Sequence, residues 1–472
     1  MKNNKFIYIL SLTFTLTMFS CQGLVDGINE DPNRIPTEDI EQQLFLTGIQ
    51  LANISFQAGH MSRISGLYSG QLFGFASVYG DVYRYNISTA ETNSSWNKIY
   101  VGVITNTRSI AANAPNDNLL VGISKVIEAH AVGTAAVVFG DVPYSEVNNP
   151  EIDDPVFDSQ VSVINAVQSL LDDAISTLQG GTSRPMVEDI HFNGDKDKWI
   201  ATAYTLKARF YMVTRNYADA YSAAQNGIMD DANSFEYVPR GTETSVDDKN
   251  QFWTTLNGAR GGDIGSGQSY LTQLMDPMNS IYRGNAKTDE TARSAYSYVV
   301  ETDGDSNMGI IEQFEPHNLV SYEENVLTLA EAGARTQGFD VGLGHLNDYR
   351  AWLNTGGPIN DNFMDLSFNY EAYEAADFMA GGMENMDNIN QDRALLREIV
   401  EERYVSGFLS WMPFDDHRRL RKSDPDLVVP FPVNDSSASG HVQRLPYASD
   451  ELNANGNAPA EPGIFSATEI NQ

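Results

Sequence analysis

A helical period is clearest in residues 198–228 of the chain. Apolar side chains recur there at intervals of three and four residues, as on one face of a helix, at Trp199, Ala203, Leu206, Phe210 and Val213. Asp195 and Asp197 precede this run, where carboxylates accept hydrogen bonds from free backbone N–H groups and suit the positive end of the helix dipole. The pattern predicts a helix that begins near Lys198 and breaks at residues 215–216.

A second apolar stripe follows the break and predicts an antiparallel partner helix. Its members are Tyr217, Ala220, Tyr221, Ala224 and Ile228. The small alanines allow a close helix–helix approach, which is typical of a tetratricopeptide-type hairpin. Such a hairpin buries its apolar face only when neighbours stack on it. An ordinary helical hairpin in an all-α domain is the alternative interpretation of this segment.

Helical spacing recurs along much of the chain. It is found at 96–114, 119–139, 161–178, 322–338, 341–353 and 393–408. A further helix is expected from Thr37, with a stripe of Leu44, Leu51 and Ile54, and Asp158 is expected to cap the helix at 161–178. The helix pairs form two blocks, at about 119–230 and 322–421, on either side of a loop-rich insertion at about 231–320. These blocks predict a mainly α-helical solenoid with an irregular ligand-bearing part and little strand.

Several segments lack helical spacing. Residues 60–95 hold many glycines and aromatic residues, and we expect irregular structure with short turns there. The insertion at 231–320 is rich in Gly, Asn, Asp and Thr, with some strand expected at 296–300. Residues 354–388 are predicted to be irregular, and the tail from Asp424 to be extended.

The N-terminus has the features of a lipoprotein signal. Lys2 and Lys5 precede a mainly apolar run at 6–19, which is shorter than the roughly 20 residues of a membrane-spanning helix. Ser20 and Cys21 match the end of a bacterial lipobox, so we expect a signal peptide at 1–20 and lipidation of Cys21. Residues 21–36 are then a lipid-anchored tether, and the acyl chains hold the protein on a membrane without spanning it. The alternative is a chance cysteine in an ordinary signal peptide.

The composition narrows the classes of partner. A hydrophobic content of 42% is typical of a folded globular chain, and the single cysteine excludes an internal disulfide. The formal net charge of −33 repels phosphate backbones, so we expect no nucleic-acid partner. Acidity says little about uncharged ligands such as sugars.

The search for catalytic and metal-binding motifs favours a binding protein. The sequence holds no HExxH, P-loop, GxGxxG or GxSxG motif, and its seven histidines are dispersed. The stretch that begins at Asp303 starts like a calcium loop, but Met308 and Phe314 stand where that loop needs Gly and Glu, which favours a solvated acidic turn. Asp415, Asp416 and the arginines that follow are interpreted as a structural ion-pair network. We therefore expect no enzyme activity, no cofactor and no metal.

Two loop-rich stretches carry the side chains that bind sugars. Aromatic rings lie against the C–H faces of a sugar, and amides, carboxylates and arginines hydrogen-bond its hydroxyl groups. The predicted ligand-binding residues are Trp253, Tyr79, Tyr83, Tyr85, Arg260, Tyr270 and Tyr282, with Trp253 as the first candidate. The alternative is that these aromatic residues only pack against the solenoid.

Taken in order along the chain, several short motifs resemble the SusD/RagB family of nutrient-binding outer-membrane lipoproteins. They are the lipobox at Cys21, the DPN at 31–33, GDVPYS at 140–145, PVFD at 155–158, KW at 198–199 with YADA at 217–220, AEA at 330–332, and RLPY at 444–447 with DE at 450–451. One departure is the C-terminus, which ends GIFSATEINQ where relatives often finish on Trp-rich residues. This leaves the contact of the final tail open.

The resemblance implies a fold, a location and a partner. The fold would be one domain at 37–472, a solenoid of about four tetratricopeptide pairs with a more variable side that carries the ligand site. The protein would be a non-catalytic, surface-exposed lipoprotein of a Gram-negative outer membrane. It would sit over a SusC-like TonB-dependent barrel and deliver an oligosaccharide, or a peptide, to it. Two alternatives are an acidic scaffold that binds only protein and a glycoside hydrolase, which would need two carboxylates about 5–9.5 Å apart.

Overall fold

The computed structural model describes residues 40–245 and 248–472. The predicted signal peptide, Cys21, the tether and the predicted helix start at Thr37 lie outside the described residues.

The described part of the chain is mainly helical, as predicted. Its α-helices are α2 (Leu44–Gln57), α3 (His60–Tyr68), α4 (Ser77–Tyr83), α5 (Asn93–Asn97), α6 (Thr105–Asn113), α7 (Asn118–Phe139), α8 (Gln160–Gln179), α9 (Lys196–Val213), α10 (Tyr217–Ala224), α11 (Gln251–Asn257), α12 (Tyr270–Met275), α13 (Thr291–Tyr296), α14 (Tyr322–Thr336), α15 (Phe339–Leu353), α16 (Gln391–Ser406), α17 (Met412–Ser423) and α18 (Ser449–Ala454). A π-helical segment, η3 (Lys98–Ile104), joins α5 to α6, and short 3₁₀ turns include η2 (Thr89–Thr92), η4 (Asp231–Asn233), η5 (Ala375–Phe378) and η6 (Glu469–Asn471).

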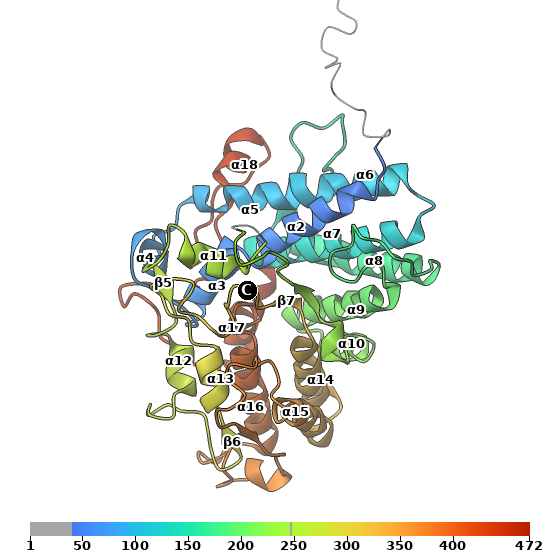
Figure 1. Ribbon diagram of the computed structural model, residues 1–472. Coiled ribbons are helices and arrows are strands. Elements are labelled where there is room, and N and C mark those ends of the chain that lie inside the picture. Colours follow the sequence, from blue (N-terminus) through green and yellow to red (C-terminus); the bar gives the residue numbers. More distant parts are fainter. Residues whose placement is uncertain (1–39, 246–247) are drawn as a thin grey trace, which may run out of the picture.

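Helix pairs stack in sequence order through the described residues (Figure 1). The first pair is α2 with η3 and α6, and α7/α8, α9/α10 and α14/α15 follow. Each pair contacts the next, through α2 on α7, α8 on α9 and α10 on α14. This confirms the predicted solenoid of about four pairs. The first pair lies outside the two predicted blocks.

Helix α7 is the central helix of this stack. Asp117 caps it by accepting a hydrogen bond from the backbone N–H of Leu120. By length and composition α7 could cross a membrane, but 94% of its most apolar window is buried inside the protein. The helix is therefore a core element, enclosed by α2, α6, α8 and α9.

The predicted hairpin at 198–228 is confirmed. Asp195 accepts hydrogen bonds from the backbone N–H groups of Asp197 and Lys198 at the start of α9. The chain breaks at Arg215, whose φ of 61° lies in the left-handed region. At α8 the cap is Ser159 instead of the predicted Asp158. The Asp158 carboxylate accepts from the backbone N–H groups of Tyr144 and Ser145, because Asp158 lies in a strand next to that turn.

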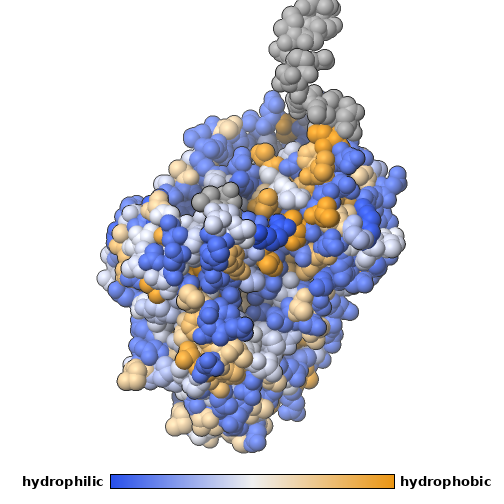
Figure 2. Space-filling model, viewed as in Figure 1, coloured by the Kyte–Doolittle hydropathy of each residue, from blue (hydrophilic) through white to orange (hydrophobic). Residues whose placement is uncertain are grey.

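Helix α2 buries a different face from the one predicted. Leu44 and Leu51 are 57% and 48% exposed, although Ile54 is buried. The buried side also carries Gln50, Asn53 and Gln57, which are polar but bond inside the protein, for example Gln50 to the Asp189 carboxylate at 2.7 Å. An apolar pattern counts such residues as outward-facing, which is why the prediction was wrong here. In Figure 2 exposed hydrophobic side chains are clear in the upper right of the view, over the region of α2 and α6.

Residues 60–95 are more regular than predicted. They form α3, α4 and the 3₁₀ turn η2. Glycine and aromatic content suggested turns, but Met61, Ile64 and Leu67 follow helical spacing and are fully buried. Packing of this apolar face outweighs the low helix propensity of glycine.

The strands are short, and those described form four antiparallel pairs. These are β1 (Phe73–Gly74) with β5 (Ile264–Gly265), β2 (Val142–Pro143) with β3 (Phe157–Asp158), β4 (Phe235–Tyr237) with β7 (His317–Val320), and β6 (Thr288–Asp289) with β8 (Asn369–Tyr370). The strand expected at 296–300 is absent from the described residues, because α13 runs to Tyr296 and Val299 bonds to the backbone and hydroxyl of Ser266. The β4–β7 pair joins the start of the insertion to its end.

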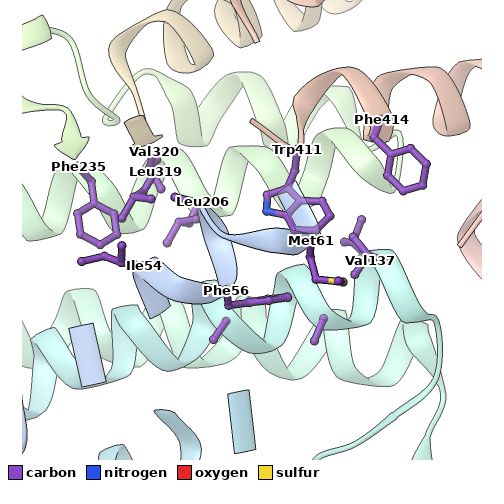
Figure 3. Packing of buried hydrophobic residues seen from close by; sticks show 14 of the residues in the cluster. Ile54, Phe56, Met61, Val137, Leu206, Phe235, Leu319, Val320, Trp411 and Phe414 are labelled. Atoms are coloured by element: carbon purple, nitrogen blue, oxygen red, sulfur yellow. The ribbon is translucent and has the colours of Figure 1, made fainter. Parts of the chain in front are cut away.

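The largest core cluster draws on residues from Leu46 to Ile470. In Figure 3, side chains of α2 and α3 meet Leu206 of α9, Leu319 and Val320 of β7, and Trp411. A second cluster lies between α14, α15 and α16 and includes Leu327, Leu346 and Ile399. Helices α14 and α16 contribute to the edges of both clusters.

The predicted ion-pair network around Asp415 and Asp416 is confirmed. Asp416 accepts from Arg403 at 2.7 Å and from Arg419 at 2.8 Å, and Asp415 pairs with Arg418. Glu331 of α14 extends the network, since it pairs with Arg419. The network joins α14, α16 and α17.

Candidate functional site

A cleft of about 430 Å³ opens between α3 and α11. One wall comes from the end of α2, from α3 and from residues 91–95, and the other from Tyr237 and residues 248–255. The lining side chains are polar or charged and include His60, Arg63, Glu91, Ser94, Tyr237, Asp248, Lys249, Gln251 and Thr254. A second open groove, of about 410 Å³ between α8 and α9, is lined by Val161, Ile164, Tyr211 and Ile470 among others. The first cleft holds more charged groups and lies beside aromatic residues predicted to bind a ligand.

Helix α3 places His60 and Arg63 on one face, because residues three apart are neighbours on a helix. Arg63 Nε donates to the Tyr79 hydroxyl at 2.7 Å, and that hydroxyl lies 3.1 Å from His60 Nδ1. His60 Nε2 lies 3.0 Å from the Glu91 carboxylate. Since the arginine can only donate, the tyrosine donates to Nδ1, and the Nε2–H of a neutral His60 donates to Glu91. Burial, followed by the nearby charge of Arg63, lowers the pKa of His60 and supports this neutral form.

Tyr79 therefore forms the back of the cleft wall. Its side chain is 1% exposed, so its ring has no open face for a sugar. Its hydroxyl instead links Arg63 to His60. We assign Tyr79 a positioning role.

Lys249 lies on the opposite wall, and Trp253, which does not line the cleft, packs against it. Asn250 caps α11 by accepting from the backbone N–H groups of Phe252 and Trp253. Lys249 Nζ lies 4.6 Å from the centroid of the Trp253 ring and donates to Gln313 Oε1 at 2.8 Å. Trp253 is 8% exposed, so it lies behind Lys249 and shapes the wall from below.

A half-buried aromatic group, formed at β1 and α4, lies next to α3. Phe73 packs against Tyr83 with ring centroids 4.4 Å apart and against Phe75 at 4.9 Å. Strand β1 pairs with β5, and the Asp263 carbonyl accepts a hydrogen bond from the backbone N–H of Phe75. Arg260, which is exposed, lies 3.5 Å from the Asp263 carboxylate. The structure thus brings two predicted residues, Tyr83 and Arg260, to the same small sheet.

The aromatic group lies close to the cleft, because β1 contacts α4 and α4 contacts α3, which forms part of the cleft wall. In Figure 1, β5, α4, α3 and α11 gather on one side of the helix stack. The polar cleft and the aromatic group can therefore contact neighbouring parts of one extended ligand.

None of the seven predicted residues lines the cleft itself, and three of them pack against other parts of the protein. Tyr85 packs on Tyr68 and Phe465, and its hydroxyl accepts from the backbone N–H of Asn434. Tyr270 packs near Tyr404 and Phe431, with centroid distances of 6.3 and 6.5 Å. The Tyr282 hydroxyl accepts from the backbone N–H of Glu290 at 3.0 Å. Each has a structural partner where it lies.

No sequence pattern pointed to four of the residues that line the cleft, which are His60, Arg63, Glu91 and Lys249. The helical spacing of α3 would have placed His60 and Arg63 on one face, but residues 60–95 were interpreted as irregular. Lys249 is distant from them in sequence and reaches the cleft only through the fold of the insertion. No local motif joins these residues.

The stretch after Asp303 forms a turn. The Asp303 carboxylate accepts from the backbone N–H of Ser306 at 2.7 Å and from its hydroxyl at 3.1 Å. These bonds within the chain lower the pKa of Asp303. The geometry is that of the predicted acidic turn.

Comparison with known proteins gives the relatives of this chain. Residues 32–409 match a family model, SusD-like, described as starch-binding and associating with the outer membrane. Among solved structures, a SusD/RagB family protein of Bacteroides thetaiotaomicron has 18% identity and a TM-score of 0.64, covering 89% of this chain and 95% of its own. A chitin-binding SusD homologue of Flavobacterium johnsoniae has 17% identity and a TM-score of 0.65, covering 91% and 97%.

A third structure gives the same picture. A SusD homologue of Bacteroides uniformis has 16% identity and a TM-score of 0.64, covering 92% of this chain and all of its own. A search among curated proteins found no match. At these identities the solved structures establish the fold, whereas the family model matches most of the sequence. The helix-pair stack, the ordered motifs and this match together place the chain in the SusD-like family of outer-membrane-associated proteins.

Proposed function

We propose that the protein is a non-catalytic outer-membrane lipoprotein that captures a nutrient oligomer, a glycan, and delivers it to a SusC-like TonB-dependent barrel. Lipidation at Cys21 would hold it on the membrane, with the folded body exposed at the cell surface. The chitin-binding relative and the family description support a glycan ligand.

The observation that carries this proposal is the cleft of about 430 Å³ beside the aromatic group of Phe73, Phe75 and Tyr83. Hydroxyl, carboxylate and cationic groups line the cleft and suit sugar hydroxyls as partners. The half-buried rings supply apolar faces for the C–H side of a sugar. Of the residues predicted from sequence, Tyr83 and Arg260 are the proposed ligand contacts, and Tyr79 and Trp253 are proposed to support the walls.

The test is a binding screen on the mature lipoprotein from Cys21 onward, kept in detergent. Native affinity electrophoresis and calorimetry would compare polysaccharides, oligosaccharides and peptides. We expect a glycan to bind, and Tyr83→Ala to weaken it about tenfold, or about 1.4 kcal/mol, because a stacked aromatic ring is worth about that much.

Tyr211→Ala is the matched control, because Tyr211 is a half-buried tyrosine that lines the separate α8–α9 groove. We expect it to bind like the wild type, and circular dichroism would verify that both variants fold. Loss of binding in Tyr211→Ala alone would move the site to that groove. If peptides bind and no glycan does, the proposed ligand would be a peptide instead of a glycan. A barrel that co-purifies with a protein that binds neither would favour a scaffold.

A further inference from the structure

Two cations line the cleft without a carboxylate partner. Arg63 is 7% exposed and Lys249 is 5% exposed, so both charges are largely removed from solvent. Across residues 40–245 and 248–472, neither forms an ion pair with an Asp or Glu side chain. The chain holds 63 acidic residues and only 30 Lys and Arg. With carboxylates in such excess, a buried cation without a carboxylate partner is unexpected.

Arg63 is incompletely bonded. Its Nε donates to Tyr79, and its guanidinium lies 5.6 Å from the centroid of the Phe252 ring. Its Nη1 is buried and has no hydrogen-bond partner within the part of the chain that the structure describes. A buried cation without a counter-ion destabilises a fold, since nothing offsets its lost hydration.

Among the described residues, the side-chain contacts of Lys249 are with neutral groups. Its ammonium donates to the Gln313 side-chain oxygen and lies over the rings of Trp253 and Phe314, at 4.6 and 5.4 Å from their centroids. These contacts fix the position of the charge and leave it uncompensated. A fixed ammonium of this kind is a ready point of attraction for an anion.

The carboxylates that line the same cleft, in contrast, have partners. Glu91 accepts from His60 at 3.0 Å. Asp248 accepts from the Tyr237 hydroxyl at 2.8 Å and lies 3.6 Å from Arg240. Both carboxylates thus accept a hydrogen bond within the protein, whereas among the described residues Arg63 Nη1 has no acceptor and Lys249 has no carboxylate partner.

We propose that the cleft recognises an anionic group of its ligand, and that the ligand is an acidic glycan whose hexuronate carboxylate binds between Arg63 and Lys249. This rests on the proposed function and assigns its substrate class. Arginine and lysine donors form charge-assisted hydrogen bonds to carboxylates, which are stronger than neutral ones. The net charge of −33 repels densely charged polymers, which favours a glycan with charges spaced along a neutral backbone.

The experiment compares matched pairs of glycans on the mature lipoprotein by calorimetry. Each pair consists of a uronate oligosaccharide, from pectic, alginate and glucuronoxylan sources, and the same backbone with its carboxylates methyl-esterified. For at least one pair we expect the acid form to bind ten times more tightly than the ester, with an affinity that falls as NaCl rises. A sulfated oligosaccharide with no uronate is included, and tighter binding of that ligand would replace the carboxylate with a sulfate.

The variant that tests the residues is Lys249→Met, which keeps an unbranched stem over Trp253 and removes the charge. We expect this variant to bind the acid form of the glycan at least ten times more weakly than the wild type does, and to bind the ester form with unchanged affinity. Lys125→Met is the charge-matched control, since Lys125 pairs with Asp173 between α7 and α8. We expect this variant to bind the acid form with the same affinity as the wild type. Equal loss in both variants would mean that only the overall charge matters and would overturn the assignment.

The outcomes separate this inference from the proposed function. Equal binding of acid and ester forms, or binding of neutral glycans alone, would overturn the acidic ligand while the glycan-binding function stands. Failure of every glycan to bind to the folded protein would overturn both.

Discussion

Gly133 permits the close packing of α7 against α9. A Cβ at this position would overlap the ring of Phe210, which is 1% exposed. We expect Gly133→Ala to lower the free energy of unfolding by about 1–2 kcal/mol, because overpacking outweighs the gain in helix propensity. The measurement is the midpoint of urea unfolding.

Gly48→Ala is the matched control, since Gly48 also lies within a helix but a Cβ there would meet nothing within 4 Å. It should leave the protein unchanged or stabilise it by up to about 1 kcal/mol. A Gly133→Ala protein as stable as the wild type would show that the Phe210 ring moves aside without cost.

His417 is expected to make stability depend on pH. Both of its ring nitrogens are buried and have no hydrogen-bond partner among residues 40–245 and 248–472. The centroid of its ring lies 4.5 Å from that of His441 and 4.5 Å from that of Phe431. Burial, followed by the charges of His441, Arg421 and Arg418, holds its pKa well below the usual value. The stability that neutral His417 contributes is therefore fully present above pH 6.5. It is lost as the pH falls, because His417 takes up a proton in the unfolded state before it does so in the folded state.

The test is His417→Phe, compared with the wild type by denaturant unfolding between pH 5 and 8. We expect the loss of stability between pH 6.5 and 5 to be shallower in the variant, by up to about 1.4 kcal/mol per pH unit. The raised pKa values of Glu236 and Glu323, each about 7, act in the opposite direction but equally in both proteins. Parallel curves for the two proteins would contradict the assignment.

At this scale the sequence identified useful residue types but not their exposure. The aromatic ring of Trp253 lies within a glycine-rich stretch, as a loop ligand contact would, yet Lys249 covers it. The ring of Tyr79 is enclosed because Arg63 and His60 meet its hydroxyl. Such neighbours come from elements that are separate in the sequence, so burial could not be predicted from residues 60–95 or 231–320 alone.

Among the elements, α14, α16 and α17 are held together by Glu331. Its fully buried carboxylate accepts from Arg335 at 3.0 Å and from Arg419 at 2.9 Å, and it lies 3.3 Å from Arg403. We expect Glu331→Gln to lower the free energy of unfolding by about 3–5 kcal/mol, because the substitution leaves three buried arginines with too little negative charge around them. Thermal unfolding would measure the loss.

An exposed pair provides the comparison for Glu331. Asp387 and Arg397 lie 2.7 Å apart with side chains that are 54% and 36% exposed. Asp387→Asn should cost less than about 1 kcal/mol, since water screens the pair. Similar losses in both variants would mean that the buried network contributes no more than a surface pair.

Prediction of elements succeeded where one apolar face repeats over several turns. Helices α7, α8, α9 and α14 were predicted within a few residues because their buried faces follow helical spacing. It failed at α2, whose inner face carries Asn53 and Gln57 hydrogen-bonded near His130. Prediction also failed at α3 and α4, because tertiary packing determines that these residues form helices.

For the whole molecule we expect one cooperative unfolding transition. The two core clusters meet at α16, where Leu396 and Val400 belong to the first and Leu395 and Ile399 to the second. Unfolding of one cluster therefore exposes apolar surface of the other. Far-UV circular dichroism, which reports every helix, should give the same urea midpoint as tryptophan fluorescence.

Trp352→Phe sharpens this test, because Trp352 packs against the second cluster while Trp199 and Trp411 belong to the first. In that variant the fluorescence reports mainly the first cluster, and its midpoint should still match the dichroism. Two separate midpoints would mean that α14, α15 and α16 unfold on their own.

The pairing of β4 with β7 has a consequence for how such a protein changes. Tyr237 and His317 are partners on this sheet, so the long excursion between them leaves the helix stack and returns to it at the same place. Chain whose ends already meet can be lengthened, shortened or exchanged with little strain on its surroundings. The segment between residues 238 and 316 also sends Leu256 and Ile264 into the main core and pairs Arg283 with Glu398 of α16. Grafting a relative's segment there is therefore a route to new ligand preference only if these inward-facing residues are kept while the residues that face the cleft change.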